Sequence, residues 1–582
     1  MTAPTTHPPE PSTAPAPGRP PARWVLPTAP DPAVVATLAE ALHLPDSICR
    51  LLIARGHSAA ESAKRFLRPR LDHLHAPGSM LDLDRAVERL ARAIRDRETI
   101  LIHGDYDVDG MCSTTLMTRA IRGFGGIAVP FIPRRLEDGY DLTEAGVRAA
   151  HDAGARVVVT CDCGTSAVAA IASLCAAGID VIVTDHHVPG GDLPECLAVL
   201  NPKRAGCDYP DSDLAAVGVA FKLAMALAER LGANTAPILG MLDLVALATV
   251  ADIAPLRGEN RVFVRYGLRL LAETRNPGLR ALVRSSGLEA KELTAGRIGF
   301  ILAPRLNAVG RLGHAMRGVE LLMSENEHEA LVIARELEEL NRKRQEIDRE
   351  TLVQARAQLA DPVLRDAFGL VIAREGWHPG VIGIVASRIV EETGKPTVLI
   401  AVSGNEGKGS GRSIPAFDLH AALSGTRDIL LRFGGHRAAA GVTIAADRIP
   451  ELARRFDAAA RAALRPEDLA PEVRIDLEVE LGDVTPELEA LLRHFEPFGL
   501  GNPGPVLLAR GVRLVGAPRI VGENGLKLRL QTPTGVLEAL GWGMAHRASE
   551  LRGHPIDITF RLEREEWNGK SKLQARLVDF RS

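Results

Sequence analysis

Ile100-Leu-Ile-His103-Gly-Asp-Tyr-Asp-Val-Asp109-Gly110 is the stretch that decides the fold of this 582-residue chain. It is a short apolar run that ends on a histidine and several acids. The same pattern recurs where Val157-Val-Val-Thr160 leads into Asp162, and where Val181-Ile-Val-Thr184 leads into Asp185-His186-His187. Such runs are typical of buried strands in an open parallel sheet, where ligands bind outside the carboxyl ends of the strands. We therefore expect these acids and histidines to meet in one crevice.

Amphipathic segments separate the apolar runs, and this alternation predicts βαβ units. Helices are expected over residues 143–153 and 166–177, because each segment ends at a glycine placed where a helix C-cap favours positive φ (Gly154 and Gly178). The pattern continues from about 45 to 320. We assign residues 45–324 to an α/β domain with a parallel sheet.

Three further regions follow from changes in the pattern. Residues 325–360 contain a stretch without proline or glycine and with many opposite charges at i, i+4, which predicts one long connecting helix. Residues 361–465 predict a second, smaller α/β lobe, with strands at 370–373 and 397–400 and two glycine-rich segments. From 466 to 582 short runs of period two predict a small β-barrel resembling an OB-fold. Residues 1–30 are rich in Pro, Ala and Thr and predict a disordered tail.

The composition is that of an ordinary globular protein, and the net charge is -3. This excludes a globally basic surface, so any nucleic-acid binding must depend on a local groove. Seven cysteines without regular spacing indicate unpaired thiols in a reducing compartment. No apolar stretch is long enough for a membrane span, and the N-terminus lacks a signal-peptide pattern. We expect a cytoplasmic protein without a membrane association.

The densest set of candidate ligands is His103-x-x-x-Asp107-x-Asp109. Asp107 and Asp109 are two residues apart, so in an extended loop they project to one side. Asp105 has the same parity, and we expect one of these three acids to orient a ligand rather than bind a metal. A fourth segment, the apolar helix 244–252, ends on Asp252. A helix cap or an acidic turn explains any one of these segments, but not all four together.

The donor types indicate the kind of cation. The set is rich in aspartate, contains histidine and lacks a plausible cysteine, which suits Mn²⁺ or Mg²⁺ better than a structural zinc. There are enough ligands for two ions with one bridging carboxylate. Two such ions activate a water and stabilise both the attacking and the leaving oxygen in phosphodiester hydrolysis.

At this point the motifs resemble a known family. The order His-x3-Asp-x-Asp, Asp, Asp-His-His, Asp is similar to that of the DHH phosphoesterase superfamily, and Gly409-Ser-Gly-Arg-Ser413 and Gly434-Gly-His436 resemble its DHH-associated domain. The segments 303–313, 376–383 and 495–503 resemble those of the bacterial single-strand-specific 5′-to-3′ DNA exonucleases of this superfamily. The resemblance covers residues 45 to 582.

The resemblance implies roles for individual residues. One metal would be held by His103, Asp107 and Asp162, and the other by Asp109, Asp162, His186 and Asp252. His187 would contact the scissile phosphate as an electrostatic stabiliser or acid, and the catalytic group would comprise His187, Asp185 and Asp105. Phosphate and DNA contacts would come from Arg134, Arg305, Arg311, Ser410, Arg412 and His436. For each arginine a surface salt bridge is the competing interpretation.

The function implied by the resemblance is a metal-dependent, processive 5′-to-3′ exonuclease that degrades single-stranded DNA to mononucleotides in DNA repair and recombination. Its partners would be single-stranded DNA, a single-strand DNA-binding protein and a helicase. Trp542, Trp567 and Phe498 are candidates for stacking on bases, although core packing is the favoured role for each. Two alternatives stay open. One is a small-substrate hydrolase acting on oligoribonucleotides, cyclic dinucleotides or pyrophosphate, and the other is a non-catalytic binding module in replication.

Overall fold

The computed structural model describes residues 21–135, 137–289, 292–551, 555–567 and 570–582, without the side chains of 566–571. Residues 1–20, the larger part of the predicted tail, lie outside the described residues. The chain divides into two compact units. Unit 2 comprises Arg65–Lys343 and the short segment Phe495–Gly504, and unit 1 comprises the described residues up to Lys64 together with Arg344–His494 and Pro505–Ser582. Each unit is described by itself.

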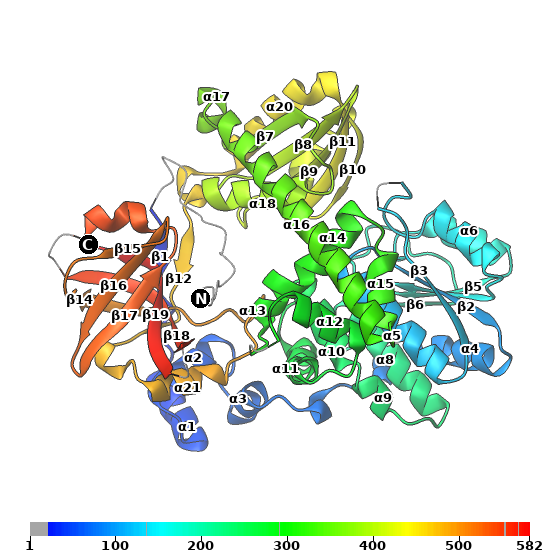
Figure 1. The fold of residues 1–582 in the computed structure, drawn as a ribbon, viewed down its shortest axis with the longest axis horizontal. Coiled ribbons are helices and arrows are strands. Elements are labelled where there is room, and N and C mark those ends of the chain that lie inside the picture. Colours follow the sequence, from blue (N-terminus) through cyan, green and yellow to red (C-terminus); the bar gives the residue numbers. More distant parts are fainter. Residues whose placement is uncertain (1–20, 136, 290–291, 552–554, 568–569) are drawn as a thin grey trace. The chain divides into compact units, whose positions relative to one another are not determined.

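Unit 2 is built on a five-stranded sheet in the order β3-β2-β4-β5-β6. Figure 1 labels β2, β3, β5 and β6 of this sheet. Every neighbouring pair in this sheet is parallel. The strands are β2 (Thr99–Gly104), β3 (Ile127–Phe131), β4 (Val157–Cys161), β5 (Asp180–Thr184) and β6 (Ala198–Leu200). Three of them are the apolar runs singled out in the sequence, so the predicted parallel sheet is confirmed.

Helices cover both faces of this sheet. Ile100 and Ile102 of β2 belong to a core shared with α4 (Leu83–Arg95), α5 (Val108–Gly123) and α8 (Ala216–Arg230). Leu101, between them, belongs to a second core on the opposite face, shared with α6 (Glu144–Asp152) and α7 (Val168–Ala176). Burial on both faces explains why these strands are continuous apolar runs rather than alternating ones.

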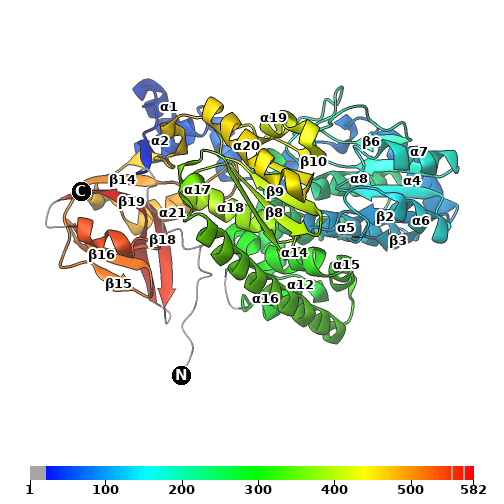
Figure 2. The same ribbon diagram turned by 90° about the horizontal axis from the view of Figure 1, so that it is seen from above.

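The remainder of unit 2 is helical, and it leads into the long helix predicted from the charge pattern. That helix, α16 (Glu327–Gln358), is continuous over 32 residues (Figure 2). The helices before it in this part of the chain are α3 (Ala60–Leu67), α9 (Ala236–Leu239), α10 (Leu242–Ala251), α11 (Gly258–Ala272), α12 (Pro277–Ser285), α13 (Ala295–Arg297), α14 (Ala303–Leu312) and α15 (Met316–Met323).

Unit 1 contains the predicted second α/β lobe, whose five-stranded sheet has the order β10-β11-β9-β8-β7. The strands β7 (Leu370–Glu375) and β8 (Thr397–Ser403) are parallel, and the others are antiparallel. The glycine-rich segments contribute to the strands β9 (Glu406–Arg412), β10 (Leu430–Gly435) and β11 (Ala439–Ala445). Glycine is depleted in strands, and β9 forms nevertheless because it pairs with a strand on either side. The helices are α17 (Pro362–Asp366), α18 (Ile382–Thr393), α19 (Leu419–Ser424) and α20 (Ile449–Ala463).

The C-terminal part of unit 1 is a sheet in the order β13-β14-β18-β19-β17-β16-β15. A bridge between Leu514 and Leu530 joins the chain beyond β14 to β16, which curls the sheet into the expected OB-like barrel. The elements are β12 (Glu472–Arg474), β13 (Leu477–Glu478), α21 (Pro486–Arg493), β14 (Leu507–Val512), β15 (Arg519–Val521), β16 (Gly525–Thr532), β17 (Gly535–Gly541), β18 (Ile556–Trp567) and β19 (Lys570–Arg581).

The predicted disordered tail ends earlier than residue 30. Residues Arg23–Val25 form a strand, β1, that pairs in parallel with β12. The indole nitrogen of Trp24 donates a hydrogen bond of 2.7 Å to Asp579, so a single aromatic residue anchors this strand beside the barrel domain. Two helices follow, α1 (Pro32–Leu42) and α2 (Asp46–Ala54). Within the described part of the chain, no helix is both long and apolar enough to cross a membrane.

Candidate metal centre

Acids and histidines from four separate segments meet at the carboxyl edge of the unit 2 sheet. They form three overlapping groups, within each of which one ligand atom per residue lies within 4.8 Å of the others. The segments follow β2, β4 and β5, and the fourth is the end of α10. The groups are Asp162, His186 and His187; Asp109, His186 and Asp252; and Asp105, Asp107 and Asp162.

Two of the three acids after β2 are fixed by the starts of helices. Asp107 caps α5, and its Oδ1 accepts hydrogen bonds from the backbone amides of Asp109 (2.9 Å) and Gly110 (3.1 Å). Asp109 accepts bonds from the amides of Ala216 (2.8 Å) and Val217 (2.9 Å) at the start of α8. These backbone hydrogen bonds fix the orientation of both side chains at helix N-termini, where negative charge is favoured.

Asp162 holds the central place in the site. It follows β4 in the left-handed region with φ 65°, which is uncommon for a residue other than glycine. Its Oδ1 lies 3.3 Å from Nε2 of His186 and 3.8 Å from Nδ1 of His187. Such backbone strain is concentrated at functional sites. Since Asp162 belongs to two of the three groups, it is suited to be a carboxylate shared between two cations.

Several buried ligand atoms in the site have no hydrogen-bond partner among the described residues. They are His103 Nε2, Asp105 Oδ1, Asp162 Oδ1 and His186 Nε2. A buried polar atom left without a partner costs about 1–3 kcal/mol. Four such atoms, all of types that bind metals, indicate that this donor set fits divalent cations. His103 is fully buried but lies outside the three groups, whereas Asp105, which was assigned to the catalytic group, forms a group with Asp107 and Asp162.

The electrostatics of the site also favour a cation. Burial, and then the neighbouring carboxylates, raise the pKa of Asp109 to about 7. The same two causes raise the pKa values of Asp105, Asp162 and Asp252 well above the usual range. Burial lowers the pKa of His103 to about 4 and that of His186 to about 3, so both imidazoles are neutral, which is the form that binds metals. A divalent cation would relieve the repulsion among these crowded carboxylates.

His187 differs from the other histidines of the site. Its Nδ1 donates a hydrogen bond of 2.8 Å to Asp185 Oδ1, and Asp185 is in turn held by the amide of Thr165 at 3.0 Å. Burial opposes the charge on His187, but the hydrogen bond and the charge of Asp185 raise its pKa to about 9. The side chain is 49% exposed. His187 is therefore an imidazolium at neutral pH, and it can reach a ligand.

One neighbour of His187 was not foreseen from the sequence. His187 Nε2 lies 3.2 Å from the hydroxyl of Tyr140, to which the imidazolium donates. The Tyr140 ring meets Tyr106 edge to face at 6.1 Å, and Arg135 lies 4.7 Å above the centre of the Tyr106 ring. Tyr140 lies in a loop between β3 and α6, far along the chain from the acids, and no pattern in a single sequence marks it.

The close packing of α6 on His103 yields a test of that residue. A Cβ at Gly146 would lie 2.7 Å from Nε2 of His103, so Gly146→Ala must displace the imidazole. We expect this variant to bind Mn²⁺ about 10–100-fold more weakly, as for other changes that disturb the support of a ligand. Calorimetric titration of the metal-free protein measures the loss. Gly123→Ala is the matched control, because nothing lies within 4 Å of a Cβ there. Equal affinity in the two variants would exclude His103 as a ligand.

Two of the three candidate DNA-binding residues of unit 2, Arg134 and Arg305, form salt bridges with glutamates. Arg305 makes a bidentate pair with Glu338 (2.5 and 3.2 Å). This salt bridge is the interpretation that competes with a role in phosphate binding. Arg134 pairs with Glu137 on an exposed loop. Arg311 lies on α14.

The candidates of unit 1 lie on the glycine-rich sheet. Ser410 and Arg412 occupy alternate positions of β9 and so share one face of the strand, where Arg412 donates a bond of 3.1 Å to Ser410 Oγ. His436 follows β10 and is exposed. Trp542 is 43% exposed, so the expectation of core packing is wrong for this residue. The Trp567 side chain lies outside the described ones.

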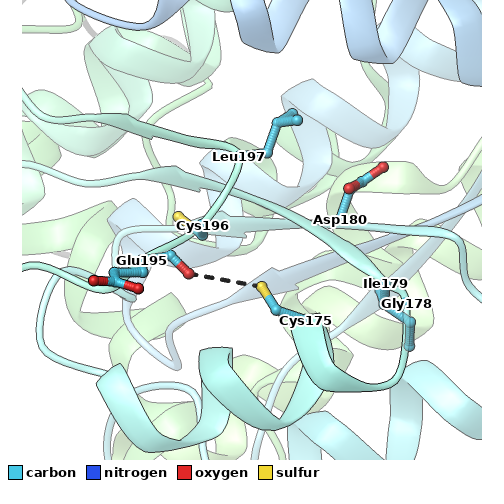
Figure 3. A pocket seen from close by; sticks show the side chains of 7 residues that line it. All are labelled: Cys175, Gly178, Ile179, Asp180, Glu195, Cys196 and Leu197. Carbon is cyan, nitrogen blue, oxygen red and sulfur yellow. Dashed lines mark hydrogen bonds between the residues drawn. The ribbon is translucent and has the colours of Figure 1, made fainter.

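A pocket at the opposite edge of the unit 2 sheet is distinct from this site. It is lined by Cys175, Gly178, Ile179, Asp180, Glu195, Cys196 and Leu197, near the starts of β5 and β6 (Figure 3). Cys175 donates a weak bond to the carbonyl of Glu195. Burial raises the pKa of Cys196 to about 11, so this thiol is not a reactive thiolate at neutral pH. In a parallel α/β sheet ligands bind at the carboxyl ends, which places the chemistry at the edge that bears the carboxylates.

The fold and the site define a protein of the DHH class. The family model described as the DHH family N-terminal domain matches residues 99–249, the DHHA1 domain matches 366–462, and the RecJ OB domain matches 475–579. RecJ from Bacillus subtilis is 37% identical over 96% of this chain and 70% of its own length, and RecJ from Escherichia coli is 36% identical over 91% and 95%. The chain belongs to the RecJ family of single-stranded-DNA-specific exonucleases.

A solved structure supports the same assignment. RecJ from Thermus thermophilus in complex with Mn²⁺ superposes with a TM-score of 0.83 at 33% identity, covering 96% of this chain and 80% of that one. The structure of the same protein with Mg²⁺ has a TM-score of 0.79 and 31% identity, covering 96% and 78%. The α/β lobes and the barrel expected from the sequence are therefore those of the family.

Proposed function

We propose that this protein is a metal-dependent exonuclease that degrades single-stranded DNA from the 5′ end to mononucleotides, in DNA repair and recombination. The observation that carries the proposal is the cluster of unpartnered donor atoms at the carboxyl edge of the unit 2 sheet. The relatives named as single-stranded-DNA-specific exonucleases, and the Mn²⁺ and Mg²⁺ in their solved structures, support the substrate and the cations.

The proposed roles follow the groups in the site. One cation would be held by His103, Asp107 and Asp162, with Asp105 close enough to replace or orient a ligand, and the other by Asp109, Asp162, His186 and Asp252. When bound, two such ions supply an activated water and charge stabilisation for phosphodiester hydrolysis. Asp185 holds the His187 imidazolium in place, and His187 is poised to contact the negative charge of a scissile phosphate.

Each unit carries residues that we propose as contacts for the strand. The β9 face with Ser410 and Arg412, together with His436, offers donors for a phosphate, and Arg134, Arg305 and Arg311 are the candidates of unit 2. Arg305 would have to leave Glu338 to take this role. The exposed ring of Trp542 on the barrel is suited to stacking on a base.

The proposal also covers the domain limits, the protein partners and the location of the protein in the cell. We propose domains at 45–324, 361–465 and 466–582, with residues 325–360 as the connecting helix. Each of the three matched family segments lies inside one of these domains. A single-strand DNA-binding protein and a helicase are the proposed partners, and the cytoplasm is the proposed location.

The two alternatives are less well supported. A hydrolase of small substrates has no need of the barrel domain, which occupies the last hundred residues of this chain. A non-catalytic module has no need of a complete ligand set, yet every predicted ligand is a competent donor.

A strand-degradation assay tests the proposal. Purified protein with Mn²⁺ or Mg²⁺ is expected to release mononucleotides from 5′-phosphorylated single strands and to leave blunt duplexes intact. Strands labelled at either end establish the polarity, since release of the 5′ label must come first. A chelator should abolish turnover. Preferential cleavage of dinucleotides would support the small-substrate hydrolase instead, and intact strands with every metal would contradict the proposal.

A further inference from the structure

The segment Phe495-Glu-Pro-Phe-Gly-Leu-Gly-Asn-Pro-Gly504 interrupts the stretch that matches the barrel domain, yet it folds as part of unit 2. It forms a closed loop of its own. The backbones of Gly499 and Asn502 bond to each other in both directions (2.9 and 3.1 Å). The Asn502 side chain donates bonds of 2.8 Å to the carbonyls of both Phe495 and Pro497. We call residues 495–504 the brace loop.

Arg261 of α11 anchors the brace loop in unit 2. This arginine is 3% exposed, and it donates a bond of 2.9 Å to the carbonyl of Phe495 and one of 3.0 Å to the carbonyl of Phe66. Its guanidinium lies 4.0 Å from the centre of the Phe66 ring, and Phe66 meets Phe495 edge to face at 5.4 Å. A buried charge held by two carbonyls and an aromatic ring fixes the loop firmly against α11.

The brace loop also contacts the turn that carries Asp252. After α10 the chain reverses at Ile253, a β-branched residue with φ 58° whose side chain is exposed, so burial of this side chain does not hold the turn. Four residues beyond Asp252, the amide of Leu256 donates a bond of 2.7 Å to the carbonyl of Leu500. Arg257 Nε then donates a bond of 3.0 Å to the carbonyl of Gly501.

Glycines at two positions of the brace loop allow its close approach to this turn. A Cβ at Gly501, where φ is +74°, would lie 3.1 Å from both Pro255 Cβ and Arg257 Nε. At Gly499 a Cβ would lie 2.7 Å from the Leu256 side chain. Pro255 itself is held from the other side, because Asn260 donates to its carbonyl at 3.1 Å. The turn is thus clamped between α11 and the brace loop.

We propose that the brace loop positions the metal ligand Asp252. The Asp252 carboxylate lies beside Asp109 and His186 only while residues 495–504 are packed against α11 and the turn after α10. The inference rests on the metal centre of the proposed function. Asp252 belongs to the group with Asp109 and His186 and not to the group with Asp105, Asp107 and Asp162. Disturbing the brace loop should therefore weaken one cation site and spare the other.

Titration of the metal-free full-length chain with Mn²⁺ alone, without DNA, tests the inference. The wild-type protein is expected to bind two ions. In Gly501→Ala one ion should bind as in the wild type and the second about 10–100-fold more weakly. Asn502→Ala, which removes the side-chain hydrogen bonds that close the brace loop and adds no bulk, should likewise weaken the second ion and leave the first unchanged. A merely structural role would lower the melting temperature without separating the two affinities.

Two controls match these variants. Gly516→Ala introduces the same strain, because φ is +82° there, but nothing lies within 4 Å of its Cβ. Leu500→Ala alters only an exposed side chain of the brace loop, since its carbonyl makes the contact. Both should bind two ions normally. Two normal affinities in Gly501→Ala and Asn502→Ala would overturn the inference alone, whereas failure of the wild type to bind Mn²⁺ would overturn the metal centre and the inference with it.

Discussion

Replacing Asp162 with asparagine is expected to abolish nuclease activity while stabilising the metal-free protein. In the proposed assignment Asp162 is a ligand of both cations, so its loss should disable both sites. It belongs to two of the three ligand groups, and its Oδ1 lies 3.3 Å from Nε2 of His186, a member of the third. Two-metal catalysis supplies several kcal/mol of transition-state stabilisation, and about 1.4 kcal/mol corresponds to tenfold in rate, so we expect a loss of at least ~10³-fold. Degradation of a labelled single strand with Mn²⁺ measures it.

The gain in stability has a definite pH dependence. Burial and the neighbouring carboxylates raise the pKa of Asp162 far above its value of about 3.9 in an unfolded chain. Above about pH 4 the unfolded chain has released this proton while the folded chain retains it, so the stability of the metal-free wild type falls as the pH rises through the folded-state pKa. Asparagine carries no charge, so the variant avoids this loss.

Melting temperatures at pH 5 and pH 8 test this part of the prediction. Without metal, Asp162→Asn should melt above the wild type, by more at pH 8 than at pH 5. Addition of Mn²⁺ should raise the melting temperature of the wild type only. Asp152→Asn, at the exposed end of α6, should behave as the wild type in every respect. A metal-free variant that is less stable at pH 8 would show that Asp162 is not under electrostatic strain.

The sequence predicted where the acids and histidines gather because the topology of a parallel sheet fixes the place where its strands end. Three apolar runs end on acids or histidines, and parallel pairing brings those ends to one edge without any knowledge of side-chain packing. Asp252 was found for a related reason, since a carboxylate at the end of an apolar helix is conspicuous. Charge pattern and the absence of helix breakers likewise located α16.

The features that escaped prediction depend on contacts that are remote in sequence. The strand β9 is stabilised by its two neighbours and not by its glycines, so local propensity indicated a loop. Arg305 was a candidate for phosphate binding, but it pairs with Glu338 on α16, which lies 33 residues further along the chain. Tyr140 contacts His187 through one hydrogen bond, and the brace loop contacts the Asp252 turn through two; such contacts leave no periodic pattern in the chain.

Removal of the His187 imidazole is expected to slow the reaction without removing the cations. Removing one group that stabilises charge developing in the transition state costs about 10²–10³-fold in rate, so His187→Ala should lose activity in that range. In the proposed assignment His187 is not a metal ligand, so Mn²⁺ binding should be close to normal. His151→Ala, at the exposed end of α6, is the control and should be fully active. If Mn²⁺ binding were lost together with activity, His187 would instead be a ligand in its group with Asp162 and His186.

The pH profile separates a charged His187 from a neutral one. Asp185 raises the pKa of His187 to about 9, so the imidazolium is present below that pH and is lost as the pH rises through it. Bound divalent cations would lower this pKa by repulsion, which places the alkaline fall in activity at or below pH 9. In Asp185→Asn the hydrogen bond to a charge is lost, and the fall should move to lower pH. In His187→Ala the low residual activity should lack this alkaline fall, because the group that titrates is absent. An alkaline limb that stays in place in both variants would show that another group controls it, and His187 would then have no role that depends on its charge.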